Sequence, residues 1–331
     1  MATTVIAAFN EFMKDTVNLK KADTDDARAS GDWLIGKMND FEKDDKFPVS
    51  FPAIHIAFGS FARRTKIRPL DDIDLMFGLT GQGATYTILS DRITVTSSGE
   101  GSRLHSYRHS GADTVCSVRI LNAFKNRLQD IAQYAQADIR RNQEAVTLKL
   151  VSKDWNFDIV PCFITSEDAF GRTYYLIPDG NGHWKFTDPR KDRDRVTTIN
   201  VQNNGNVLNV IRAVKYWQRR PTMPSMSSYL LETLILDYYA GRTSCSSFVD
   251  MELEALFRHL GQSVRYSVND PKGIQGDINS LSAEARKAIS DRCYLDAQKV
   301  SEARWFENNK EYEKSINKWR DVFGPFFPVY G

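Results

Sequence analysis

The chain has 331 residues, of which 41% are hydrophobic and 26% charged, a composition typical of a globular protein with a sizeable core. Its 44 basic and 42 acidic residues leave a net charge of +2, which argues against a protein that coats nucleic acid. No apolar run approaches the roughly 18 residues of a membrane span, no signal-like start is present, and the four cysteines are widely spaced. We therefore expect reduced thiols, no zinc ribbon and a cytoplasmic location.

The first half of the chain mixes helical and strand patterns. Apolar side chains recur at helical spacing from Val5 to Lys46, which predicts two amphipathic helices. Short β-branched and apolar runs predict strands at 55–58, 72–79, 137–139, 146–151 and 157–163, a surface hairpin that includes 93–96, and a helix over 114–134.

The second half of the chain is predicted to be helical. A polar loop at 188–195 leads into five helical patterns, at 200–219, 227–241, 249–260, 282–303 and 307–322. This change of pattern predicts an α+β fold with two domains, a mixed sheet flanked by helices over residues 1–180 and a helical domain over residues 181–331.

Two acidic residues, Asp72 and Asp74, lie two positions apart in the second predicted strand. Side chains at this spacing point to the same face of a strand, while Ile73 and Leu75 point to the other face and into a core. The two carboxylates repel each other unless a cation compensates, and Mg²⁺ prefers such oxygen ligands. The alternative is a solvated strand face, which is the commoner fate of an isolated Asp-x-Asp.

Two further features give this acidic pair a chemical context. Gly59 and Ser60 directly follow an apolar strand, and a glycine there lets backbone N–H groups approach a phosphate while the serine hydroxyl binds it. Asp158 is a lone acid in the apolar strand FDIVPCF, where a carboxylate needs a partner or a metal. Alternatively, Gly59-Ser60 is a simple turn and Asp158 pairs with an arginine or caps a strand.

The combination of Gly59-Ser60, Asp72-x-Asp74 and a later strand with Asp158 resembles the signature of the polymerase β-like nucleotidyltransferases. The resemblance implies catalysis with two Mg²⁺ ions, for which Mn²⁺ can substitute. All three carboxylates would hold the ion at the attacking ribose hydroxyl, and Asp72 and Asp74 the ion at the triphosphate. Asp72, Asp74 and Asp158 are therefore the predicted catalytic and metal-binding residues.

Features of the second half narrow the resemblance. Lys215 lies in the basic helix VIRAVKYWQRR, Ser228 and Tyr229 begin the segment SYLLE, and the chain ends with FGPFFP. By themselves these suit a solvated basic helix face and a core tyrosine. Together with the earlier motifs they resemble the bacterial cGAS/DncV-like nucleotidyltransferases, the signal synthases of the anti-phage systems called CBASS. The resemblance extends from about residue 50 to residue 328.

This resemblance implies a polymerase β-like catalytic core, a helical domain and synthesis of a cyclic di- or trinucleotide from NTPs such as ATP and GTP. Gly59 and Ser60 match the phosphate-binding turn, Lys215 and Ser228 match triphosphate contacts, and Tyr229 matches the residue that stacks on a base. The implied partners are an effector that responds to the product and a ligase-like or other regulator from the same operon. In some operons the ligase-like protein joins the C-terminal residue, here Gly331, to a target; the alternative is that Gly331 is only the place where the helical domain ends.

Two other functions stay open. A template-independent RNA nucleotidyltransferase of the poly(A), CCA or 2-5A type would use the same carboxylates, but the near-neutral composition does not favour a polynucleotide groove. A catalytically inactive nucleotide-binding module would not need all three acids. The animal relative, cyclic GMP–AMP synthase, carries a zinc ribbon and basic DNA-binding surfaces; this chain has no Cys/His cluster, which argues against activation by DNA.

Overall fold

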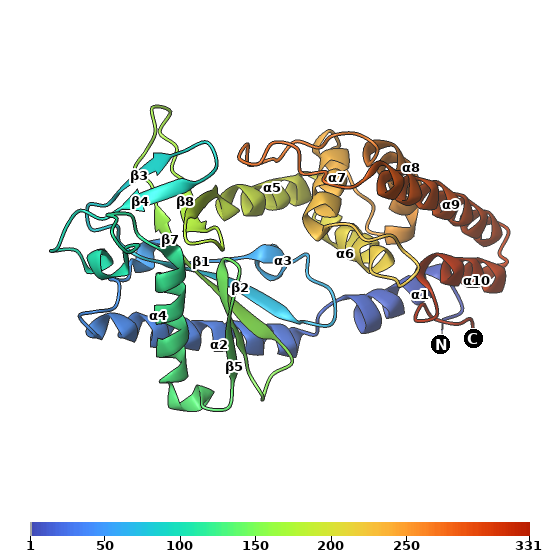
Figure 1. The fold of residues 1–331 in the computed structure, drawn as a ribbon. Helices are drawn as coiled ribbons and strands as arrows, with labels where there is room; N and C mark the ends of the chain where they lie inside the picture. The colour runs from blue at the N-terminus through green and yellow to red at the C-terminus, as the bar shows by residue number, and fades with distance from the viewer. Residues whose placement is uncertain (1) are drawn as a thin grey trace. The chain divides into compact units, whose positions relative to one another are not determined.

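The computed structural model describes residues 2–331, which form two compact units (Figure 1). The helical unit comprises the residues up to Lys20, Arg63–Pro69 and Arg190–Gly331, and the sheet unit comprises Lys21–Ala62 and Leu70–Pro189. The first residues of the chain and a short central segment therefore group with the C-terminal helices. The predicted domain boundary at 180/181 stays a prediction.

The sheet unit is built on a mixed β-sheet. Within the described residues its strands are β1 (Ile56–Phe58), β2 (Asp72–Gly78), β3 (Thr85–Ile88), β4 (Ile93–Thr96), β5 (Asp138–Asn142), β6 (Ala145–Lys149), β7 (Asn156–Ile164), β8 (Tyr175–Pro178) and β9 (Trp184–Thr187). The order is β1-β2-β7-β8-β9-β4-β3, and β6 pairs with both β5 and β7. The β2–β7 pair is parallel and joins the two strands that carry the predicted metal ligands.

Two helices, α2 (Lys21–Asn39) and α4 (Ser117–Gln129), cover the apolar side of β2 and β7. The ring of Phe124 in α4 lies 5.4 Å from that of Phe77 in β2. A Cβ placed on Gly31 of α2 would lie 3.7 Å from the ring of Phe157 in β7. One face of this pair of strands is therefore committed to core packing, and the other face carries Asp72, Asp74 and Asp158 next to a second buried cluster that includes Met76 and Val160.

The helical unit encloses one large hydrophobic core. Its main elements are α1 (Val5–Phe12), α5 (Pro189–Gln202), α6 (Val207–Gln218), α7 (Ser228–Ala240), α8 (Val249–Ser263), α9 (Ala283–Asn308) and α10 (Tyr312–Phe323). The two ends of the chain meet in this core, where the ring of Phe9 lies 4.8 Å from that of Trp319 and 5.0 Å from that of Phe327. The predicted mixed sheet with flanking helices and a helical C-terminal part is confirmed.

Two sequence-based expectations for the second half are wrong. Most of the segment predicted as a polar loop at 188–195 forms the first half of α5, and the helix predicted over 200–219 is interrupted between α5 and α6. Pro189 suits the first turn of a helix, where its missing N–H costs nothing, and the break coincides with Asn204 and Gly205, both at positive φ. The pattern was misread because α5 begins with charged residues and shows little apolar periodicity.

Strands β8 and β9 were not predicted. All four residues of β8 are buried, so this strand shows no alternation of polar and apolar residues. Among residues 2–331, no helix combines the length and the apolar character that crossing a membrane requires.

Candidate active site

The predicted metal ligands of the sheet unit lie on one face of two neighbouring strands. In the parallel pair, Asp74 of β2 is directly opposite Asp158 of β7, and Asp72 lies two residues before Asp74. Residues in register on adjacent strands share a face, as do residues two apart on one strand. Ile73 and Leu75, on the opposite face, are 3% and 4% exposed. The structure therefore brings the three predicted carboxylates onto a common surface.

Asp158 has a neutral hydrogen-bond partner on the next strand. Thr147 of β6 is opposite Asp158, and its Oγ1 donates to Asp158 Oδ1 at 2.6 Å. A hydroxyl donor holds the carboxylate in place without cancelling its charge. The sequence-based analysis did not predict Thr147, because the register of β6 on β7 is not visible in either strand alone.

Gly59 makes a close contact with Asp74. Phe58 of β1 is opposite Asp74 in the antiparallel β1–β2 pair, and Gly59 follows with a φ of 68°. A Cβ on Gly59 would lie 1.7 Å from Asp74 Oδ2 and 2.6 Å from its Cγ. Only glycine permits both this backbone conformation and this approach of the carboxylate. The structure therefore joins the Gly59-Ser60 turn to the acidic pair; Ser60 is the second residue of the short helix α3 (Gly59–Ala62).

The fit of this face to a metal ion depends on its donor atoms. Among residues 2–331, no group of three or more His, Cys, Asp or Glu side chains is arranged to hold a metal ion. Mg²⁺, however, is commonly bound by one or two carboxylates together with substrate phosphates rather than by a cage of protein ligands. Asp72, Asp74 and Asp158 supply carboxylate oxygens of the required kind on one face, so the residues fit that mode of binding.

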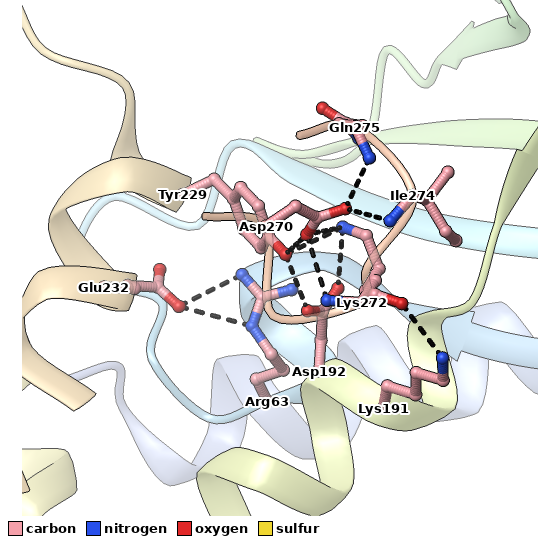
Figure 2. Close-up of polar contacts among 9 residues, drawn as sticks. All are labelled: Arg63, Lys191, Asp192, Tyr229, Glu232, Asp270, Lys272, Ile274 and Gln275. Carbon is pink, nitrogen blue, oxygen red and sulfur yellow. Dashed lines mark hydrogen bonds and ion pairs between the residues drawn. The ribbon is translucent and has the colours of Figure 1, made fainter. Parts of the chain in front are cut away.

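In the helical unit, Lys215 belongs to a buried ion-pair cluster centred on Glu232 of α7. Lys215 Nζ lies 2.7 Å from Glu232 Oε1, and Arg63 Nη2 lies 3.0 Å from Glu232 Oε2; Figure 2 shows the Arg63–Glu232 pair. Thr65 Oγ1 donates to the same Oε2 at 3.0 Å. The side chains of Lys215 and Glu232 are only 8% and 3% exposed. The predicted triphosphate contact of Lys215 stays a prediction, and in this structure its ammonium binds Glu232.

Burial alone would raise the pKa of Glu232, but the positive charges of Arg63 and Lys215 outweigh it and hold that pKa below its usual value. Glu232 is therefore ionised at neutral pH. One carboxylate facing two cations leaves this cluster with an excess of positive charge.

Ser228 and Tyr229 begin α7, as the sequence predicted. Ser227 Oγ caps this helix by accepting the backbone N–H of Tyr229 at 3.3 Å. The hydroxyl of Tyr229 lies 2.9 Å from Asp192 Oδ1 and 2.8 Å from Asp270 Oδ1 (Figure 2). Lys272 Nζ donates to the same hydroxyl at 2.8 Å. Burial, together with the neighbouring Asp192, raises the pKa of Tyr229 far above its usual value, so the phenol keeps its proton.

The sequence-based analysis missed the three residues around the Tyr229 hydroxyl. Asp192 and Lys272 come from segments 37 and 43 residues away along the chain. Neither lies in a recognisable motif, and only the packing of α5, α7 and the loop that carries Lys272 brings them together.

No family model matches this sequence. The chain is, however, 42% identical over 335 residues to a protein of Bacillus cereus (strain VD146) described as a probable cyclic nucleotide synthase, with 100% of this chain and 99% of the relative covered. It is also 22% identical over 344 residues to the cyclic AMP-AMP-AMP synthase of Escherichia coli (strain MS 115-1), with 96% and 95% covered.

The fold is similar to the crystal structure of DncV from Vibrio cholerae, a cyclic AMP-GMP synthase described as a prokaryotic cGAS homologue. The TM-score is 0.68 at 12% identity, with 97% of this chain and 95% of the other chain covered. Similarity at this low identity bears on the fold, which is shared along nearly the whole chain.

Proposed function

Because this chain belongs to the cGAS/DncV-like nucleotidyltransferases, the cyclic nucleotide synthases, we propose that it joins NTPs into a cyclic di- or trinucleotide. Each bond would form by attack of a ribose hydroxyl on the α-phosphate of an NTP with loss of pyrophosphate. A linear intermediate would then turn round and close. The relatives include both ring sizes, since one is named for a product of three AMP units and another for a product of AMP and GMP.

The observation that carries this proposal is the alignment of Asp74 with Asp158 across the parallel β2–β7 pair, with Gly59 packed against Asp74. We infer that Asp72, Asp74 and Asp158 bind Mg²⁺. When bound, Mg²⁺ supplies positive charge that stabilises the phosphates and lowers the pKa of the attacking hydroxyl. Thr147 orients Asp158 through its 2.6 Å hydrogen bond, and Gly59 with Ser60 provides the backbone approach for a phosphate.

In the helical unit, Lys215 and Ser228 are the proposed triphosphate contacts and Tyr229 is the proposed stacking residue. The exposed hydroxyl of Ser228 at the start of α7 can donate to a phosphate oxygen. For Lys215 to do so, its ammonium must share or exchange the 2.7 Å contact with Glu232. The ring of Tyr229 is only partly buried, which is compatible with stacking on a nucleobase.

The reaction can be tested with the purified full-length chain, the four NTPs and Mg²⁺. After phosphatase treatment, a cyclic product keeps its phosphates because it has no terminal phosphate, and mass spectrometry gives its bases and ring size. Extension of an added RNA would instead identify an RNA nucleotidyltransferase. Formation of neither product, while a nucleotide still binds, would identify a binding module and refute the proposal.

We further propose that the product serves as a signal in anti-phage defence, by binding an effector protein. Cells that carry the gene with its operon neighbours should lose protection against phage when Asp72 and Asp74 are replaced by Asn. Protection that persists in this variant would refute a role for the product. Attachment of Gly331 to a target by a ligase-like partner stays a prediction of the resemblance.

A further inference from the structure

The loop between α8 and α9 is ordered around one carboxylate in the helical unit. Asp270 Oδ1 accepts the backbone N–H of Lys272 at 3.1 Å, and Asp270 Oδ2 accepts those of Ile274 and Gln275 at 3.2 and 3.1 Å. From α5, Lys191 Nζ donates to the carbonyl oxygen of Lys272 at 2.9 Å. Figure 2 shows the contacts of Ile274 and Gln275 meeting at Asp270, and Lys191 contacting Lys272 at the side away from Tyr229. The loop is therefore built to hold Lys272 in a defined place.

Lys272 sits against the ring of Tyr229. Its Nζ lies 4.1 Å from the ring centroid and 2.8 Å from the hydroxyl oxygen, and the side chain is only 6% exposed. The ammonium is 3.4 Å from Asp192 Oδ2 and 3.7 Å from Asp270 Oδ1. A buried lysine is tolerated here because two carboxylates compensate its charge.

These contacts constrain the position of the ring. The hydroxyl is held by Asp192, Asp270 and Lys272 together, so the tyrosine cannot change rotamer without breaking all three contacts. The ammonium lies at the hydroxyl end of the ring, nearer to the hydroxyl oxygen than to the ring centroid. A nucleobase that stacks on a ring already fixed in its bound orientation avoids the entropy cost of ordering it.

We propose that Lys272 is a positioning residue for the nucleobase site: through the hydroxyl it locks the ring of Tyr229, so that the base of an NTP stacks on a ring already held in place. This inference rests on the proposed function, in which Tyr229 is the stacking residue. Lys272 acts through Tyr229 and does not contact the phosphates.

The test is equilibrium binding of a non-hydrolysable ATP analogue, with Mg²⁺, to the full-length chain and its variants. Tyr229→Leu should weaken binding about tenfold or more, and Lys272→Met about threefold to tenfold. The double variant should bind no more weakly than Tyr229→Leu alone, because Lys272 then has no ring to position. Lys272→Arg, which keeps the cation, should retain most of the affinity.

Two controls distinguish an effect on the position of the Tyr229 ring from the loss of a positive charge and from misfolding. Lys287→Met removes an exposed lysine paired with Asp291 and should leave binding unchanged. Inorganic tripolyphosphate has no base. Its dissociation constant, measured by competition against the analogue, should therefore be equal in wild type and in Lys272→Met. If Lys272→Met does not fold, Lys191→Met is the substitute, because it loosens the same loop without contacting the ring. Lys191→Met should weaken analogue binding, and combining it with Tyr229→Leu should weaken binding by less than the product of the two single effects.

Three results would overturn the inference. They are additive losses in the double variant, weaker competition by tripolyphosphate in Lys272→Met, and tighter analogue binding when Lys272 is replaced, which would mean that the lysine blocks the base. Unchanged analogue binding in Tyr229→Leu would instead refute the proposed stacking role of Tyr229, and with it the premise. Normal weakening by Tyr229→Leu but not by Lys272→Met would refute the inference alone.

Discussion

The sheet unit and the helical unit arrange their carboxylates in opposite ways. On the sheet, Asp72, Asp74 and Asp158 share one face of two adjacent strands, so like charges are gathered together. In the helical unit, Glu232 faces Arg63 and Lys215. The first arrangement gathers charges of one sign, as the proposed cation site requires, and the second pairs a buried carboxylate with two cations. Substitutions in the two regions should therefore differ in kind, with loss of chemistry in the first and loss of stability in the second.

The largest effect on chemistry is expected from Asp72→Asn combined with Asp74→Asn. Removing two negative charges eliminates metal binding, and product formation should fall by about a thousandfold or more. The free energy of unfolding should stay equal or rise, because repulsion between the carboxylates is relieved. Product formation and urea unfolding measure the two effects.

Asp91→Asn is the matched control, since Asp91 is an exposed carboxylate paired with Arg92, and it should change neither quantity. Activity of the double variant within about tenfold of wild type, roughly 1.4 kcal/mol of barrier, would contradict the catalytic assignment.

Glu232→Gln should have the largest effect on stability. The substitution leaves Arg63 and Lys215 buried without their counter-charge, which costs about 3–5 kcal/mol in unfolding free energy. Glu254→Gln breaks an exposed pair with Arg258 and should cost about 1 kcal/mol or less. Equal costs for the two variants would contradict the view that the Glu232 cluster is a stabilising scaffold.

The Glu232 cluster also predicts a pH dependence. Because the pKa of Glu232 is lowered in the folded protein, its contribution to stability is present above the unfolded value of 4.5 and is lost as pH falls through the folded value. The difference in stability between wild type and Glu232→Gln should therefore shrink below about pH 4.5. Urea unfolding at pH 7 and pH 4 measures this, and a constant difference would show that the carboxylate is not the group responsible.

Gly59→Ala tests the link between the turn and the carboxylate face with a smaller structural change. The new Cβ would overlap Asp74 Oδ2 and require a left-handed backbone, so unfolding free energy should fall by about 1–3 kcal/mol. Product formation should also fall, because Asp74 must move. Gly36→Ala, in α2 with no atom within 4 Å of the new Cβ, should instead stabilise by about 0.5–1 kcal/mol. Full activity in Gly59→Ala would show that the close approach of Gly59 to Asp74 is not needed for product formation.

Thr147→Val should have the smallest effect. It removes one hydroxyl donor from Asp158 and keeps the side-chain shape, so kcat should fall by a factor corresponding to about 0.5–1.5 kcal/mol. Thr87→Val, on the exposed strand β3, is the control and should not change kcat. A loss as large as that of the aspartate variants would mean that Thr147 takes part in the chemistry directly.

Much of the sheet unit could be predicted from the sequence. The alternation of Asp72 and Asp74 with Ile73 and Leu75 reports the two faces of β2 directly, since side-chain direction in a strand has a period of two. The order of apolar runs likewise indicated the strands that hold Asp158 and precede Gly59. These features depend only on residues that are close in the sequence, so the sequence alone is enough to predict them.

The pairings around the predicted residues were decided by tertiary structure. The contact between Arg63 and Glu232 spans 169 residues, and the contact between Lys272 and Tyr229 spans 43. Such contacts depend on which helices pack together, and no local periodicity reports them. The same reason explains Thr147, whose role follows from the register of β6 on β7. The sequence by itself identified the candidate residues for the proposed chemistry, and packing between distant segments decided which side chains surround them.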